Sequence, residues 1–149
     1  MVRDAVRQMA LSLPADDAAG NPGRLFSGPI ELTIPEAYAL QDEVARLREQ
    51  RGERLIGYKI GCVSRVIQQQ LGIDQPIFGR IFDTGCFRSG VRLSHSRYVN
   101  LAVEGELALR LAQDVPDSLS PDWDNRQVIE SMFPVIELHQ YVLRNTPPS

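Results

Sequence analysis

The sequence predicts an α+β chain in which helices come first and strands follow. Residues 1–52 carry apolar side chains at helical spacing, whereas residues 53–149 carry short alternating runs separated by glycine and proline. The length of 149 residues, with 43% apolar and 23% charged residues, is that of one ordinary globular domain. We therefore predict one structural unit with a helical N-terminal region, 1–52, and a β-rich region, 53–149.

Two helices are predicted in the N-terminal region. The first covers Val2 to Leu13 and has apolar residues along one face, and a loop rich in Gly, Pro, Asp and Asn follows at Asp16 to Gly28. Thr33 and Glu36 stand at the spacing of a capping box, which predicts that the second helix begins there. Its apolar residues keep helical spacing towards Gln50.

Short strands are predicted next. Leu55 to Gly61 alternates in the manner of a strand, and Ser64 to Gln70 is typical of a short capped helix. Two further strands are expected at Phe78–Phe82 and at Cys86–Leu93, where glycines interrupt the apolar runs.

The segment Val103 to Leu111 is ambiguous, because its composition favours a helix while its order alternates. As a strand it places Glu104 and Glu106 on one face and large apolar residues on the other. A short helix at Gln127–Met132 and a strand at Phe133–Leu138 complete the expected elements.

Charge and composition exclude several classes of protein. The formal net charge is −3 and the Lys and Arg residues are scattered, which argues against nucleic acid or an acidic membrane surface as a partner. No apolar run is long enough to span a bilayer, and the first residues make a poor secretion signal. Cys62 and Cys86 form neither a disulfide framework nor a metal pair, so we expect reduced, packed thiols in a cytoplasmic protein.

Three glutamates are candidate metal ligands. A strand brings the carboxylates of Glu104 and Glu106 close together, and a hard divalent cation would relieve their repulsion. Oxygen ligands with no neighbouring His or Cys pair favour Mg²⁺ or Mn²⁺ over Zn²⁺. Glu137 lies in an apolar run, where an unpaired carboxylate is costly. The alternative is that all three are solvated charges on exposed faces, or that Glu137 pairs with an arginine.

Lys59 is the candidate for substrate binding or proton transfer. It lies between Gly57 and Gly61, and glycines leave room for a ligand to approach. The alternative is an ordinary outward lysine on an edge strand. His95 and His139 receive no catalytic role, although His139 follows Glu137 by two and could support it from the same strand face.

Four segments in the same order resemble the 2-keto-4-pentenoate hydratases of the fumarylacetoacetate-hydrolase superfamily. They cover nearly the whole chain from about Ile30 onward: Glu36–Gln41, Gly57–Ser64 followed by Gln68–Pro76 and Phe78–Gly79, Val103–Ala108, and Pro134–Leu138.

The resemblance implies a fold, a site and a reaction. The fold would be a helical N-terminal part followed by a mixed-β catalytic roll, here incomplete. Glu104, Glu106 and Glu137 would bind Mg²⁺ or Mn²⁺, and Lys59 would lie beside the substrate. The reaction would add water to a 2-hydroxy-2,4-dienoate, giving a 4-hydroxy-2-oxo acid in the meta-cleavage breakdown of aromatic compounds.

Two alternatives share these residues. A 4-oxalocrotonate-type decarboxylase of 2-oxo acids would use the same metal and lysine motifs. The chain is also shorter than the family it resembles, so we expect a C-terminal truncation. A non-catalytic remnant, or a chain that depends on another polypeptide, is therefore the second alternative. The resemblance further implies a homo-oligomer or association with another subunit.

Overall fold

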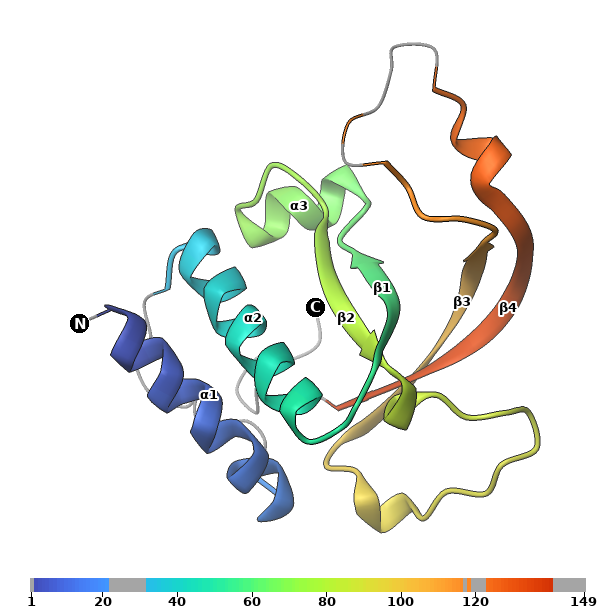
Figure 1. The fold of residues 1–149 in the computed structure, drawn as a ribbon. Coiled ribbons are helices and arrows are strands. Elements are labelled where there is room, and N and C mark those ends of the chain that lie inside the picture. Colours follow the sequence, from blue (N-terminus) through green and yellow to red (C-terminus); the bar gives the residue numbers. More distant parts are fainter. Residues whose placement is uncertain (1, 22–31, 117, 119–122, 141–149) are drawn as a thin grey trace. The chain divides into compact units, whose positions relative to one another are not determined.

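The computed structural model describes residues 2–21, 32–116, 118 and 123–140 (Figure 1). The described residues divide into two compact units, of which the first ends at Arg97 and the second begins at Tyr98. The first unit contains three helices and one antiparallel pair of strands, and the second contains another antiparallel pair. The predicted α+β class is confirmed at this level. The predicted division at residues 52 and 53 stays a prediction.

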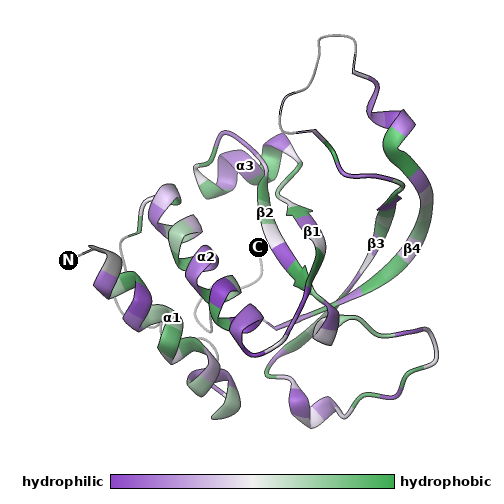
Figure 2. Ribbon diagram, viewed as in Figure 1, coloured by the Kyte–Doolittle hydropathy of each residue, from purple (hydrophilic) through white to green (hydrophobic). Residues whose placement is uncertain are grey.

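Helices α1 (Val2–Ala18) and α2 (Ile34–Gln50) pack against each other in the first unit. Figure 2 shows hydrophobic and hydrophilic segments alternating along both helices. Their contact is a small apolar core of Val6, Ala10 and Leu40, with partly buried apolar neighbours around it. The predicted apolar face of the first helix is therefore confirmed.

The predicted end of the first helix at Leu13 is wrong, because α1 continues through Pro14 to Ala18. Asp16, which the sequence placed in a loop, is instead a buried helical residue. Proline costs a helix one hydrogen bond but leaves the following residues able to stay helical when packing holds them. The part of the predicted loop from 22 to 28 lies outside the described residues.

The capping box at the start of α2 is present as predicted. The backbone N–H of Thr33 donates to the Glu36 carboxylate at 2.9 Å, and the Thr33 hydroxyl donates to it at 2.6 Å. The same hydroxyl accepts from the Glu36 backbone N–H at 3.4 Å. The two hydrogen bonds that the carboxylate accepts, from the Thr33 hydroxyl and from the Thr33 backbone N–H, lower the pKa of Glu36 because they favour its charged form.

Strands β1 (Leu55–Gly61) and β2 (Ile77–Phe82) pair antiparallel, with α3 (Arg65–Leu71) between them in the sequence. These three elements were predicted at nearly the same bounds. Gly72 ends α3 in the left-handed conformation, with φ at 67°, which glycine adopts without strain.

Helix α2 is fastened to β2 by aromatic and polar contacts. The rings of Tyr38 and Phe78 stack with centroids 4.7 Å apart, and the Tyr38 hydroxyl accepts from the Phe78 N–H at 3.2 Å. Arg80 donates to the side chains of Gln41 at 2.7 Å and Asp42 at 2.6 Å. These contacts hold β2, and through it β1, in a defined place within the first unit.

The predicted strand at Cys86–Leu93 is wrong. These residues are described and form no strand, because Gly90 turns the chain with φ at 85°. The backbone N–H of Val91 donates to the Arg88 carbonyl at 3.2 Å, which closes a local turn. In a strand these groups would instead bond to a neighbouring strand. Both cysteines are free, but Cys86 is exposed rather than packed.

The second unit is built on β3 (Leu101–Leu111) and β4 (Ile129–Gln140). The ambiguity of the glutamate-containing segment is resolved in favour of a strand, since β3 pairs with β4 over its whole length. The predicted helix at Gln127–Met132 is wrong: a single 3₁₀ turn covers Asn125–Val128, and β4 begins directly after it. Ladder hydrogen bonds to β3 outweigh the weak local helical preference of those residues.

Among the described residues, no helix is both long enough and apolar enough to cross a membrane.

Candidate metal centre

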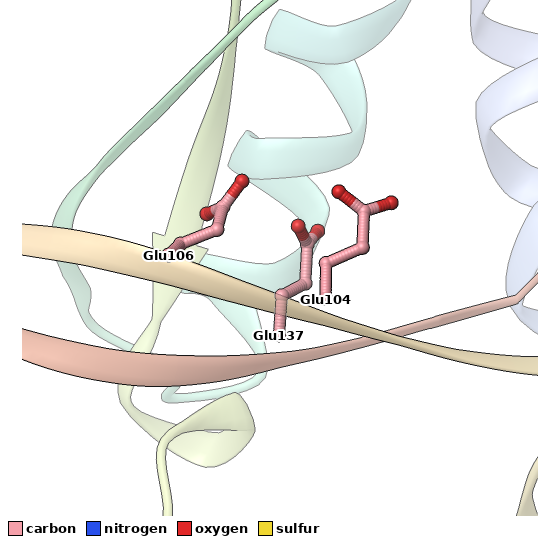
Figure 3. A group of neighbouring side chains, drawn as sticks. All are labelled: Glu104, Glu106 and Glu137. Atoms are coloured by element: carbon pink, nitrogen blue, oxygen red, sulfur yellow. The ribbon is translucent and has the colours of Figure 1, made fainter.

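The pairing of β3 with β4 brings three glutamates together on one face of the second unit. Glu104 lies directly opposite Glu137, and Glu106 follows Glu104 by two residues on the same face. One carboxylate oxygen of each can be chosen so that all three lie within 4.8 Å of one another. Figure 3 shows the three side chains projecting from the same side of the two strands. Glu104 is exposed, whereas Glu106 and Glu137 are half-buried.

This geometry suits a hard divalent cation. Three carboxylates at such distances repel one another, and each loses part of its hydration where it is half-buried. A cation with oxygen ligands removes both costs, and Mg²⁺ and Mn²⁺ take carboxylates together with water molecules. Among the described residues, these three glutamates are the only group of His, Cys, Asp or Glu placed to hold a metal ion.

His139 contacts the glutamate cluster. Its Nε2 atom lies 2.8 Å from Oε1 of Glu104, and it comes from the residue of β4 that faces Ala102. Diagonal neighbours of this kind are within reach of long side chains on an antiparallel pair. The sequence predicts no more than a shared strand face for His139 and Glu137. The structure places His139 in contact with Glu104, a residue of the other strand.

Lys59 belongs to the first unit, on β1. It is half-buried and lies opposite Gly79 of β2, and its neighbours on the same face are Gly57 and Gly61. A Cβ atom built at Gly57 or Gly79 would meet nothing within 4 Å. Lys59 therefore stands on a strand face where Gly57 and Gly79 leave space around it. The structure thus brings together the three predicted metal ligands and sets the predicted lysine in an open, glycine-lined position of its own unit.

Several curated hydratases are similar to this chain in sequence. A 2-keto-4-pentenoate hydratase of Paraburkholderia xenovorans is 32% identical over 108 residues, which are 72% of this chain and 40% of the relative. A 2-oxo-hept-4-ene-1,7-dioate hydratase of Escherichia coli is 31% identical over 118 residues, 79% of this chain and 44% of the relative. A 2-hydroxyhexa-2,4-dienoate hydratase of Comamonas testosteroni is 38% identical over 87 residues, 57% of this chain and 33% of the relative.

The chain is homologous to the 2-keto-4-pentenoate hydratases. It spans about 40% of the length of the curated hydratases that it matches. No family model matches the chain.

The fold of this hydratase homologue is also found in solved structures. The 4-oxalocrotonate decarboxylase from Pseudomonas putida G7, complexed with magnesium and adipate, matches with a TM-score of 0.79 at 22% identity. That match covers 97% of this chain and 56% of the decarboxylase chain. The same decarboxylase complexed with calcium and acetate matches with a TM-score of 0.75 at 24% identity, covering 93% and 54%. The likeness shows a shared fold over nearly the whole of this chain.

Proposed function

We propose that this chain carries the metal-binding part of a hydratase that adds water to 2-hydroxy-2,4-dienoates. The product would be a 4-hydroxy-2-oxo acid, and the pathway the meta-cleavage breakdown of aromatic compounds. Glu104, Glu106 and Glu137 would hold Mg²⁺ or Mn²⁺. The single observation that carries the proposal is the convergence of these three carboxylates on one face of β3 and β4.

Two further observations support it. The curated relatives bear the names of hydratases of 2-keto-4-pentenoate and of related unsaturated acids. A solved relative of the same fold holds magnesium together with a dicarboxylate, adipate. We propose by extension that the two strand pairs described here belong to the β roll of that fold.

The three glutamates would supply carboxylate oxygen ligands to the ion. When bound, Mg²⁺ or Mn²⁺ supplies a Lewis acid that polarises the 2-oxo and carboxylate oxygens of the substrate. The substrate must first shift a proton to become a conjugated 2-oxo acid, in which carbon 4 is electrophilic. Water then adds across the double bond between carbons 3 and 4, with its oxygen on carbon 4 and a proton on carbon 3.

Lys59 is proposed to bind the substrate carboxylate or to relay one of these protons. An ammonium group attracts a carboxylate as a point charge, and its pKa can be shifted for proton transfer in a dry site. The space that Gly57 and Gly79 leave on its strand face is compatible with either role.

The first experiment is calorimetric titration of the purified chain with Mg²⁺ and with Mn²⁺. Saturable binding that Glu106→Gln abolishes would support the metal centre. Glu130→Gln makes the same change at an exposed residue of β4 outside the cluster and should leave binding unchanged. The absence of binding to a folded wild-type chain would refute the proposed centre.

Hydration is then assayed as the loss of the dienol absorbance of 2-hydroxypenta-2,4-dienoate in the presence of the preferred ion. Turnover that disappears in Glu106→Gln and persists in Glu130→Gln would support the hydratase. Metal binding without turnover would favour a non-catalytic homologue.

A decarboxylase is the second candidate, favoured by the fold shared with 4-oxalocrotonate decarboxylase. Both reactions begin from a 2-oxo acid whose oxygens a divalent cation can polarise. Release of CO₂ from 2-oxo-3-hexenedioate without hydration of the dienol would decide for the decarboxylase. The opposite result would decide for the hydratase.

Association with another polypeptide is part of the proposal. The face of β3 and β4 opposite the glutamates is apolar, and its large side chains are 36% to 73% exposed. They are Val103, Leu107, Leu109, Leu111, Met132, Ile136 and Leu138. Exposed apolar patches of this kind mark interaction surfaces. Light scattering should give a mass above the 16.7 kDa of one chain, and Leu107→Lys should lower it.

A further inference from the structure

Helix α3 buries a glutamine and exposes its apolar residues. Gln68 is 8% exposed and is one of two polar or charged residues that are buried in the described part of the chain. Val66, Ile67 and Leu71 of the same helix are 41% to 61% exposed. A surface helix ordinarily turns its apolar side chains inward and its glutamines towards the solvent. A buried amide such as that of Gln68 therefore requires a hydrogen-bond partner.

That partner is the backbone carbonyl of Cys62, the first residue after β1. The Nε2 atom of Gln68 donates to this carbonyl at 2.8 Å. A carbonyl oxygen only accepts hydrogen bonds, so the amide nitrogen of Gln68 is the group that faces it. The Gln68 backbone is held as well, because its N–H donates to the Ser64 carbonyl at 3.0 Å and its carbonyl accepts from the Ile73 N–H at 3.0 Å. The glutamine therefore reaches Cys62 from a fixed place on the helix.

Cys62 has a backbone conformation that cysteine rarely adopts. Its φ is 56°, in the left-handed region, and the only other non-glycine residue with positive φ in the described part of the chain is Asn100. Asparagine tolerates this region, whereas most side chains are strained there because Cβ approaches the following carbonyl oxygen. The cost of one such residue and the contribution of one hydrogen bond are of similar size. The bond from Gln68 is therefore strong enough to hold the turn at Cys62.

The turn lies at the end of the strand face that carries Lys59. The ladder between β1 and β2 ends where Gly61 pairs with Ile77, and Lys59 lies two residues before Gly61 on the same face. The left-handed residue directly after Gly61 sets the direction in which the chain leaves β1 for α3. A change of φ there would displace the backbone at this end of the Lys59 face.

We propose that Gln68 is a positioning residue for a substrate site beside Lys59, and that it acts by holding Cys62 in the left-handed turn that ends β1. The inference rests on the proposed function of Lys59 and adds to it the contact that keeps the end of its strand face in place. Gln68 does not touch the substrate in this assignment, because its amide donates to the Cys62 carbonyl. Small displacements of the groups that orient a substrate can lower the rate by about 100-fold.

The test combines a substitution that removes the donor with one that removes the strain. Gln68→Met keeps a similar side-chain length and has no N–H to donate. Cys62→Gly gives residue 62 a backbone that adopts positive φ without strain, so the turn no longer depends on the hydrogen bond. Gln70→Met makes the same change at an exposed glutamine of α3 and is the control. For each variant, kcat and KM for 2-hydroxypenta-2,4-dienoate, Mn²⁺ affinity and the urea midpoint are measured.

We expect Gln68→Met to lower kcat/KM by about 10-fold to 100-fold while the chain stays folded and Mn²⁺ affinity is unchanged. Adding Cys62→Gly to Gln68→Met should restore most of kcat/KM, and Gln70→Met should match the wild type. If Gln68→Met does not fold, the double variant is compared with Cys62→Gly alone. Equal kcat/KM for these two would support the proposal, and a lower value for the double variant would contradict it.

Two other results would overturn the proposal. A lower urea midpoint with unchanged kcat/KM for Gln68→Met would leave Gln68 a purely structural role. Turnover that Cys62→Gly does not restore to Gln68→Met would mean that the glutamine does not act through the turn. A wild-type chain without any turnover would refute the proposed hydratase function, and the positioning role with it. This last failure is distinguishable from the others because it is seen before any residue is changed.

Discussion

Neutralising Glu104 tests whether the three carboxylates strain the second unit when no metal is bound. Glu104→Gln keeps the shape of the side chain, but it removes one negative charge from a group in which one oxygen of each carboxylate lies within 4.8 Å of the others. Two unit charges at that distance repel by about 1 kcal/mol in water and by about 3 to 4 kcal/mol at the lower dielectric constant typical near a protein surface.

The exposure of Glu104 decides which of these values applies. Its side chain is 52% exposed, so the value for water is the better guide and the two repulsions together amount to about 2 kcal/mol. Loss of the ion-pair contact with His139 offsets part of this gain, because an exposed pair contributes at most about 1 kcal/mol. We expect Glu104→Gln to raise the free energy of unfolding by about 1 kcal/mol in the presence of a chelator.

A bound ion should reverse the order of stabilities. An ion at 100 times its dissociation constant adds about 2.7 kcal/mol to the native state of the wild type, and Glu104→Gln loses most of this gain because it lacks one ligand. Urea unfolding is followed by the fluorescence of Trp123, the single tryptophan of the chain, which lies in the second unit. Glu130→Gln should change stability by less than about 0.5 kcal/mol under both conditions.

A variant Glu104→Gln that is less stable than the wild type in chelator would refute the repulsion argument. A variant that gains as much stability from Mn²⁺ as the wild type would refute the ligand assignment.

Three further predictions concern the first unit. Thr33→Ala removes the capping box of α2 and should cost about 1 kcal/mol in urea unfolding followed by circular dichroism; no change would mean that the cap contributes nothing. Hydrogen bonds from Arg48 and then Thr84 lower the pKa of Glu53 below its usual value of 4.5, so its stabilising effect is present above that value and lost as the pH falls through the lower folded-state pKa. The urea midpoint of Glu53→Gln should therefore fall less steeply on acidification than that of the wild type, and parallel profiles would contradict this. Lys59→Met should lower kcat/KM for dienol hydration and leave Mn²⁺ affinity unchanged, and full activity would exclude Lys59 from catalysis.

Local patterns predicted the elements whose stability is local. The helix α2 was predicted with its cap because Thr33 and Glu36 satisfy the first backbone N–H groups within a few residues. Strand β1 was predicted from the alternation of its residues, since successive side chains along a strand point to opposite faces. The strand at Cys86–Leu93 was predicted wrongly because a strand also needs a neighbouring strand to pair with. A local apolar run does not show whether such a partner is present.

The extra turn of α1 past Pro14 is another feature that local rules missed. Proline disfavours a helix interior by its own chemistry, yet the packing of α1 on α2 continues the helix to Ala18. Tertiary contacts outweigh a propensity of this size.

The sequence by itself determined which residues form the candidate site. It contains two glutamates two residues apart, a third in an apolar run, and a lysine framed by glycines, and the carboxylate ligands already favour Mg²⁺ or Mn²⁺. The tertiary structure decided that the glutamates meet. Glu104 faces Glu137 only because β3 and β4 pair in one register, and a slip of one residue would turn Glu137 to the apolar face. The same register places His139 beside Glu104, a contact between strands that no spacing along a single segment could specify.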